Sequence, residues 1–365
     1  MSALVDASVP VTLRSGVGRQ KSILERLADL PEMPLRGPLV DPYGRVHTDL
    51  RLSVTDRCNF RCTYCMPEDE AMSFLPTSDL MSVQEIERLG AVARRVGVRS
   101  VRLTGGEPLI RKGIVDIVAA LGAVGFDDLA LTTNGTGLAR LAAPLAAAGL
   151  ARVNISCDSL RPETFGAIRR RGKLATVLGA MDAAEAAGLA PLKVNVVLVP
   201  GENDDEIVDF ARFSRETGRI VRFIEFMPLD ADRRWRPDLV VPGSEVLRRI
   251  GDVFPLESSE VDEDDPAPAN RYRFADGVGE IGLISSVTEA FCGTCNRLRV
   301  TPDGAVRNCL FSDEELSVRD VMRRGGSDDD VEVVLRQSVW GKLPGHGIND
   351  PGFLQPRRSM SMIGG

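Results

Sequence analysis

The segment that begins at Leu50 reads Leu-Arg-Leu-Ser-Val-Thr-Asp-Arg-Cys-Asn-Phe-Arg-Cys-Thr-Tyr-Cys-Met and ends at Pro67. Its first six residues alternate between apolar and polar side chains, which predicts a β-strand with two different faces. The loop directly after this strand contains Cys58, Cys62 and Cys65. Thiolates are the usual ligands of iron–sulfur clusters. Because a cubane cluster has four irons, three cysteines would leave one iron open to another ligand.

Further strands alternate with helices along the next 170 or so residues of the chain. The expected strands are Leu50–Thr55, Val98–Thr104, Leu129–Thr132, Arg152–Ser156, Leu192–Val199 and Arg219–Phe226. The expected helices are Ser82–Val96, Ile114–Val124, Leu138–Ala148, Leu174–Ala187 and Asn203–Thr217. The first helix opens with a capping box, Ser82 and Glu85, and stops at Gly97. This alternation predicts a parallel sheet and an α/β fold.

Polar side chains occupy alternate positions of these strands, so they share one face of the sheet, which we call the polar parity. Arg51 and Arg102 stand on it in the first two strands, Asn154 in the fourth, and Lys193 and Asn195 in the fifth. Helices cover the outer face of a βα barrel, so the polar parity must point inward. The interior is therefore predicted to be a solvated cavity for a polar ligand, and its arginines favour an anion. The alternative is an open two-layer sheet with one face in water, which the many crossover helices disfavour.

Composition and length place limits on the class of protein. The chain has 365 residues, 43% of them hydrophobic and 27% charged, as in an ordinary globular protein. This length predicts one large domain and a smaller one. We expect a flexible leader at 1–45 with one short helix around 22–30, the barrel at 46–228, and a C-terminal α+β domain at 229–365 that includes a helix near 312–324. An acidic run at 260–265 is expected to be a solvated loop.

The same data bear on location and partners. No apolar run reaches the ~20 residues of a membrane helix, and the first residues lack the apolar core of a secretory signal. We therefore expect a cytoplasmic protein without a membrane partner. The net charge of −7 disfavours general binding to nucleic acid.

A second set of cysteines, Cys292, Cys295 and Cys309, lies late in the chain. It again offers three thiolates, and we favour a second cluster with an open iron over a zinc site that lacks a ligand or unrelated thiols. The seventh cysteine, Cys157, has the outward parity and is expected to be a buried apolar residue. Residues with a structural or solvent-facing interpretation are His47, His346 and the arginine runs 169–171, 233–234 and 323–324.

These motifs resemble the radical S-adenosylmethionine (SAM) superfamily. The resemblance rests on Cys58 to Cys65 together with Gly105-Gly106-Glu107-Pro108 after the second strand. It implies a partial (β/α)6 barrel, which agrees with the strands counted above, and a cluster whose open iron chelates SAM. The strings 52–67, 102–108, 132–135, 226–228 and 292–299 are similar to one branch, the GTP 3′,8-cyclase (MoaA) family of molybdenum cofactor biosynthesis. The likeness covers about residues 46–365.

This resemblance implies a reaction and a set of roles. A 5′-deoxyadenosyl radical would remove hydrogen from ribose C3′ of GTP, and the carbon radical would attack guanine C8 to give 3′,8-cyclo-7,8-dihydro-GTP. The implied ligands of two [4Fe–4S] clusters are Cys58, Cys62, Cys65, Cys292, Cys295 and Cys309. The implied SAM contacts are Tyr64, Gly106, Ser156 and Met227. The implied GTP contacts are Arg51, Arg102, Thr132, Lys193, Arg297 and Arg299, the last two also catalytic.

The resemblance also implies partners and a role for the C-terminal tail. The partners are a downstream cyclic pyranopterin monophosphate synthase, an electron donor such as flavodoxin or ferredoxin, and a second copy of the chain in a homodimer. The tail Gly364-Gly365 would insert toward the active site and pair with arginines such as Arg299. Two alternatives stay open at this point, namely a peptide-modifying radical SAM enzyme with an auxiliary cluster and a zinc-stabilised binding module.

Overall fold

The computed structural model describes residues 22–68, 73–259 and 268–364. The acidic run at 260–265 and the first 21 residues of the expected leader lie outside the described residues. None of the helices in the described part of the chain is long and apolar enough to span a lipid bilayer.

The expected βα alternation is present. The six strands are β1 (Asp49–Ser53), β2 (Ser100–Thr104), β3 (Asp128–Thr133), β4 (Arg152–Ser156), β5 (Lys193–Leu198) and β6 (Ile220–Glu225). The five expected helices are α2 (Val83–Arg95), α3 (Ile114–Val124), α4 (Leu138–Ala147), α6 (Leu174–Ala186) and α7 (Ile207–Thr217). The capping box of α2 is confirmed, since Ser82 Oγ accepts from the Glu85 amide while the Glu85 carboxylate accepts from the Ser82 amide.

Several elements were not predicted. These are α5 (Pro162–Arg169), α8 (Gly243–Gly251), α10 (Asp328–Trp340) and α11 (Met360–Ile363). The short helix expected around 22–30 is present as α1 (Ile23–Asp29). The helix expected at 312–324 begins only at Val318, as α9 (Val318–Arg323), because Leu316–Ser317 forms the short strand β12.

Within the described residues, the strands form one 12-stranded sheet in the order β12-β11-β10-β1-β2-β3-β4-β5-β6-β9-β8-β7. The strands β10 (Arg297–Val300) and β9 (Glu280–Ile284) pair parallel with β1 and β6, the two edges of the six-stranded core. The outer strands β11 (Ala305–Arg307), β12, β8 (Asn270–Phe274) and β7 (Leu256–Ser258) continue antiparallel. Residues 229–365 therefore extend the barrel sheet at both edges, while the exact domain boundaries stay a prediction.

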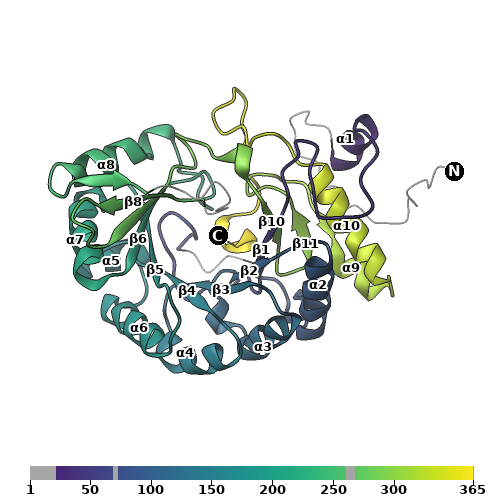
Figure 1. Ribbon diagram of the computed structural model, residues 1–365, viewed down its shortest axis with the longest axis horizontal. Helices are drawn as coiled ribbons and strands as arrows, with labels where there is room; N and C mark the ends of the chain where they lie inside the picture. Colours follow the sequence, from purple (N-terminus) through teal and green to yellow (C-terminus); the bar gives the residue numbers. More distant parts are fainter. Residues whose placement is uncertain (1–21, 69–72, 260–267, 365) are drawn as a thin grey trace.

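The sheet curves, with helices on its outer side and the C-terminal segment inside the curve (Figure 1). Leu50, Leu52, Val101 and Leu103 are at most 1% exposed and pack in the core under the helices. The opposite parity faces the interior, as predicted. The alternative of an open sheet with one face in water is wrong, because the C-terminal segment lies inside this curve, where Gly364 is close to Thr104 and Ser53.

Residues 22–45 pack against the C-terminal part of the chain. Ile23 of α1 is buried, and α1 contacts α10. Arg26 donates to the carbonyl of Gly341, and Arg336 of α10 donates to the carbonyl of Gly37. This part of the expected leader is therefore folded, and it supports the segment that follows α10.

Candidate active site

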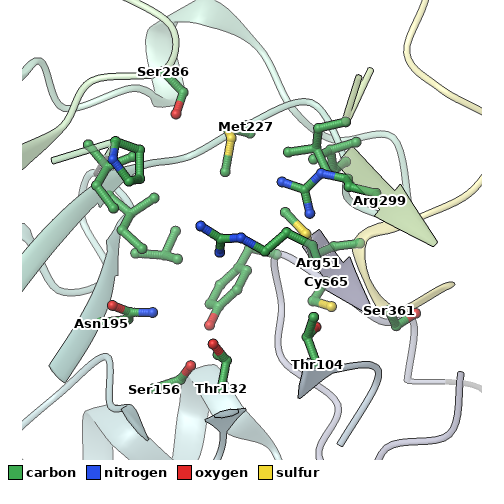
Figure 2. Close-up of a pocket in the computed structure, with 18 of the residues that line it drawn as sticks. Arg51, Cys65, Thr104, Thr132, Ser156, Asn195, Met227, Ser286, Arg299 and Ser361 are labelled. Atoms are coloured by element: carbon green, nitrogen blue, oxygen red, sulfur yellow. The ribbon is translucent and has the colours of Figure 1, made fainter. Parts of the chain in front are cut away.

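A cavity of about 290 Å³ lies inside the curve of the sheet (Figure 2). Its walls include residues of eight neighbouring strands, of the loops after them and of the C-terminal segment. Most of the residues singled out in the sequence line it, namely Arg51, Cys58, Tyr64, Cys65, Arg102, Gly106, Thr132, Ser156, Met227, Cys292, Cys295, Arg297, Arg299 and Cys309. Of the predicted site residues, Cys62 and Lys193 lie outside this lining. Cys62 contacts Arg169, which belongs to it, and Lys193 is two residues before Asn195 on β5.

The first cysteine set occupies the loop after β1. The amide of Cys65 donates to the carbonyl of Cys62 at 3.0 Å, and this turn holds the last two cysteines of the set together. Burial, and next the carboxylate of Glu107, raise the pKa of the Cys58 thiol to about 12. Burial also raises the pKa values of Cys62 and Cys65. These buried thiols need a bound cation to become thiolates, and coordinated iron supplies that charge.

The glycines after β2 are pressed against this loop. A Cβ at Gly106 would lie 2.3 Å from the carbonyl oxygen of Arg57, and one at Gly105 would lie 2.5 Å from that of Thr55. Glycine is therefore required at these two positions because the backbone of the cysteine loop lies too close to leave room for a side chain. Next to them, Glu107 accepts from the amides of Leu109 and Asn134 and from the Thr133 hydroxyl. Its burial raises the pKa of Glu107 to about 7.

The second cysteine set lines the same cavity from the C-terminal part of the chain. Burial alone would raise the pKa of Cys295, but the charges of Arg297 and Lys342 bring it down to about 6. The Lys342 ammonium donates to Cys295 Sγ at 3.3 Å. Arg45 donates to the carbonyls of Cys292, Leu343 and Pro344, so it ties the cysteine loop to the segment after α10.

Each set consists of three free thiols, which suits a cubane cluster with one open iron. Among residues 22–68, 73–259 and 268–364, no three His, Cys, Asp or Glu side chains meet the geometry of a site for a single metal ion.

Three arginines stand side by side between the two cysteine sets. Arg51 of β1 is in register with Arg102 of β2 and with Arg299 of β10. Asp49 accepts two hydrogen bonds from the Arg51 guanidinium, both at 3.0 Å. Arg102 Nε is buried and has no hydrogen-bond partner within the described part of the chain. Among the described residues, six arginines and three carboxylates line the cavity, so its interior suits a polyanion.

Burial and mutual repulsion lower the pKa values of these cations. Burial, followed by the charge of Arg51, lowers the pKa of both Arg222 and Arg299 to about 9. Burial, followed by the charge of Arg222, lowers the pKa of Lys193 to about 8. Arg222 was not predicted as a site residue, although its parity on β6 would have indicated it, since it pairs in register with inward-facing Asn195.

The C-terminal tail enters the site. Ser361 and Met360 line the cavity, and Arg299 Nη1 donates to the carbonyl of Gly364 at 2.6 Å. Figure 2 shows Ser361 and Arg299 on the same side of the cavity. The expected contact between the tail and Arg299 is confirmed for Gly364, while Gly365 lies outside the described residues.

Other sequence predictions have mixed outcomes. Cys157 is fully buried, as expected. The arginine runs 233–234 and 323–324 are exposed, also as expected. The expectation that the run 169–171 is a solvated face is wrong for Arg169, which is buried beside the first cysteine set. His47 is buried against Asp41, whereas His346 lines the cavity and contacts the carbonyl of Ser286.

Comparisons with known proteins match both halves of the chain. Residues 52–214 match the model of the Radical SAM superfamily, and residues 219–348 match that of Molybdenum Cofactor Synthesis C. A protein of Mycobacterium sp. (strain KMS) named GTP 3′,8-cyclase is 48% identical over 338 residues, which are 91% of this chain and 95% of the relative. A protein of Corynebacterium glutamicum with the same name is 44% identical over 364 residues, 96% of each chain.

Solved structures of more distant proteins share the fold. The structure of native anSMEcpe with bound AdoMet has a TM-score of 0.54 at 15% identity, over 80% of this chain and 81% of that one. The structure of Streptococcus suis SuiB has a TM-score of 0.53 at 13% identity, over 82% and 67%. At these identities the likeness concerns the fold alone.

Proposed function

The chain belongs to the radical SAM superfamily and, within it, to the GTP 3′,8-cyclase family, and we propose that its cavity binds GTP between two [4Fe–4S] clusters. Its activity is the GTP 3′,8-cyclase reaction of molybdenum cofactor synthesis, and its cofactors are SAM and [4Fe–4S] clusters. The observation that best supports the proposed GTP site is the row of Arg299, Arg51 and Arg102, which faces a cavity bounded by both cysteine sets.

The cysteine sets are the proposed cluster ligands. In this proposal Cys58, Cys62 and Cys65 hold the cluster that binds SAM, and Cys292, Cys295 and Cys309 hold the other. When bound, the first cluster and SAM supply the 5′-deoxyadenosyl radical chemistry of the family. The proposed SAM contacts, Tyr64, Gly106, Ser156 and Met227, all line the cavity.

The barrel cations are the proposed triphosphate site. An arginine fork matches phosphate oxygens, and a lysine adds a compact charge. We assign this role to Arg51, Arg102, Thr132, Lys193 and Arg222. Arg297 and Arg299 are next to the second cysteine set and are assigned to the guanine and ribose. Binding a polyanion there would relieve the mutual repulsion that lowers the pKa values of these cations.

The direct test is anaerobic incubation of the reconstituted protein with SAM, dithionite and GTP, followed by mass analysis. We expect 5′-deoxyadenosine together with a cyclised product of GTP, and about eight irons per chain for two cubanes. Formation of 5′-deoxyadenosine without any product from GTP would contradict the proposal and favour the peptide-modifying alternative. About one zinc per chain and no iron would favour a binding module.

Substitution of Arg102 tests the triphosphate site. Methionine keeps the apolar stem and removes the charge. Loss of a charge-assisted hydrogen bond costs ~1.5–3 kcal/mol, so Arg102→Met should weaken GTP binding roughly ten- to a hundredfold and guanosine binding much less. Calorimetry under anaerobic conditions measures both affinities. Arg140→Met, on the exposed face of α4, is the matched control. Equal weakening of GTP and guanosine would place Arg102 away from the phosphates.

The pH dependence of GTP affinity tests Lys193. Its pKa of about 8 means that it loses its charge as the pH rises through 8. A bound triphosphate raises this pKa, so binding above pH 8 takes up a proton. The affinity should therefore fall between pH 8 and 10, by up to about tenfold per pH unit for one proton. The variant Lys193→Arg keeps its charge, and its affinity should fall less steeply than that of the wild type. An equal pH dependence of GTP affinity in the wild type and in Lys193→Arg would show that Lys193 does not contact GTP.

The remaining partners follow from the reaction. We infer a one-electron donor such as flavodoxin or ferredoxin, because the cluster that binds SAM must be reduced in each turnover. We also infer a cyclic pyranopterin monophosphate synthase as the consumer of the product, a homodimer, and a cytoplasmic location. The free state of all seven cysteines supports a reducing compartment. Co-purification and sedimentation of the reconstituted protein test these inferences.

A further inference from the structure

Arg169, the last residue of α5, is a buried cation beside the first cysteine set. It is 3% exposed, whereas Arg171 of the same arginine run is exposed. Burial of a guanidinium is costly unless it has an anion and good hydrogen-bond partners. The contacts of Arg169 therefore need an explanation beyond solubility, and the function described above makes no use of them.

The guanidinium lies between a cluster ligand and a carboxylate. Arg169 Nη1 donates to Cys62 Sγ at 3.1 Å, and Nη2 forms an ion pair with Asp158 Oδ2 at 2.5 Å. The rings of Phe60, Tyr64 and Phe165 surround it, with centroids 5.9 to 6.0 Å from Cζ.

Backbone contacts fix α5 against the cysteine loop. The amide of Arg61 donates to the carbonyl of Arg169, and the amide of Thr63 donates to that of Ile168. The end of α5 and the cysteine loop therefore form one unit. Within this unit the guanidinium cannot move far from Cys62.

Asp158 links this unit to the proposed SAM contacts. Its carboxylate also accepts from the Tyr64 hydroxyl at 2.8 Å and from the amide of Val197 at 3.0 Å. A carboxylate with these additional donors is fixed in place, and it holds Arg169 directed at the sulfur. Arg169 Nε and Nη2 are both buried without a hydrogen-bond partner within the described ranges, so the contact of Nη2 with Asp158 is an ion pair, and both nitrogens keep N–H groups for a group bound beside them.

We propose that Arg169 is a positioning residue that hydrogen-bonds the ligand sulfur of Cys62 and thereby raises the reduction potential of the cluster held by the first cysteine set. A hydrogen bond from a cation withdraws electron density from a thiolate, and hydrogen bonds to the sulfurs are among the factors that set cluster potentials. Asp158 maintains this geometry. The inference rests on the proposed role of the first cysteine set as cluster ligands.

The donors to Cys58 in the same set are neutral. They are the amide of Phe60, at 3.4 Å, and the amide side chain of Asn134, at 3.8 Å. The second set has its own cation, Lys342, on Cys295. A change at Arg169 should therefore alter one cluster and leave the other unchanged, which provides an internal control.

The test is a redox titration of the reconstituted full chain, followed by electron paramagnetic resonance, for the wild type and for Arg169→Met, Arg169→Gln and Arg169→Lys. We expect Arg169→Met to shift the one-electron equilibrium of the first cluster about tenfold toward the oxidised form, about 59 mV for one electron. Glutamine keeps a neutral donor and should give a smaller shift, and lysine should restore most of the potential. The second cluster should not shift.

Three results would overturn the inference: an unchanged potential in the methionine and glutamine variants with the cluster present, an equal shift of both clusters, or no rescue by lysine. If these variants do not assemble the cluster, the hydrogen bond is tested instead in wild-type protein labelled with ¹⁵N-arginine. Pulsed resonance of the reduced first cluster should then show coupling to a guanidinium nitrogen, and its absence would refute the hydrogen bond. A wild-type chain that holds no cluster at Cys58 to Cys65 would instead refute the proposed function.

Discussion

Replacement of Cys58, Cys62 or Cys65 by alanine should abolish SAM cleavage, with no 5′-deoxyadenosine above the reagent background. Three thiolates are the minimum that leaves one iron of a cubane open in a defined position. The set lies on a loop held by Cys62–Cys65 and Gly106–Thr55 backbone hydrogen bonds, so a lost ligand has no substitute nearby. The product is measured chromatographically after anaerobic reduction with dithionite.

The second cysteine set should give a different result. Cys292→Ala, Cys295→Ala and Cys309→Ala remove the proposed ligands of the second cluster, which line the same cavity, and leave the first loop intact. We expect some uncoupled SAM cleavage in these variants and no cyclisation of GTP. Normal amounts of cyclised product from any of the three would show that the second set has another role.

Cys157→Ala is the matched control for both sets. This thiol is fully buried directly after β4 and donates to the carbonyl of Ser159. Its removal should lower stability modestly and leave the iron content and both reactions at wild-type levels. Loss of iron from this variant as well would show that general destabilisation, and not ligation, explains the other results.

The local pattern was sufficient for the six strands of the barrel and for five of its helices, but not for α5. Leu50, Leu52, Val101 and Leu103 alternate with polar residues, and because one face of each strand is covered by helices, this alternation determines which side chains point inward. The same parity rule placed Arg51 and Arg102 in the interior before their register was known. It would have placed Arg222 there too, had it been applied to the sixth strand.

Contacts between distant segments could not be predicted in this way. The pairing of β10 with β1 puts Arg299 beside Arg51, although the two residues are far apart in the sequence. The hydrophobic periodicity of each strand does not show which strands pair. Likewise, Arg45 has no motif around it, and its role in holding the Cys292 loop depends on three carbonyls brought together by the fold.

Arg169 shows a different limit. In a run of three arginines the most common environment is solvent, and composition alone cannot show that one of them is buried. Its burial depends on α5, which was not predicted, and on Asp158, whose carboxylate supplies the compensating charge. The ring of Phe165, one turn earlier on α5, packs against Phe60 of the cysteine loop and sets the position of the helix end.

The C-terminal tail gives the second large expected effect. Gly364→Ala should lower the rate of cyclisation about 10²-fold, since a small misplacement of a catalytic group can have that cost. Gly364 has φ +85°, and a Cβ there would lie 2.8 Å from Thr104 Oγ1 and 3.0 Å from Ser53 Cβ. The methyl group cannot fit without moving the tail, and the tail carbonyl holds Arg299.

Steady-state kinetics with GTP measures this effect, and iron content and SAM affinity should not change. Gly345→Ala is the matched control, because a Cβ at Gly345 has no heavy atom within 4 Å and its backbone does not have a positive φ. This variant adds the same methyl group to the same C-terminal segment. It should keep the wild-type rate.

Removal of Gly364 and Gly365 tests whether the tail acts by orienting Arg299 or only by filling part of the cavity. If the tail acts by holding the guanidinium, the truncated enzyme should lose most of its cyclisation rate while SAM cleavage continues without coupling. A peptide of the last several residues, added in trans, should restore part of the rate, because its backbone can again accept from Arg299 Nη1. Full activity of the truncated enzyme would mean that Arg299 reaches its working position without the tail, and the contact at Gly364 would then have no catalytic consequence.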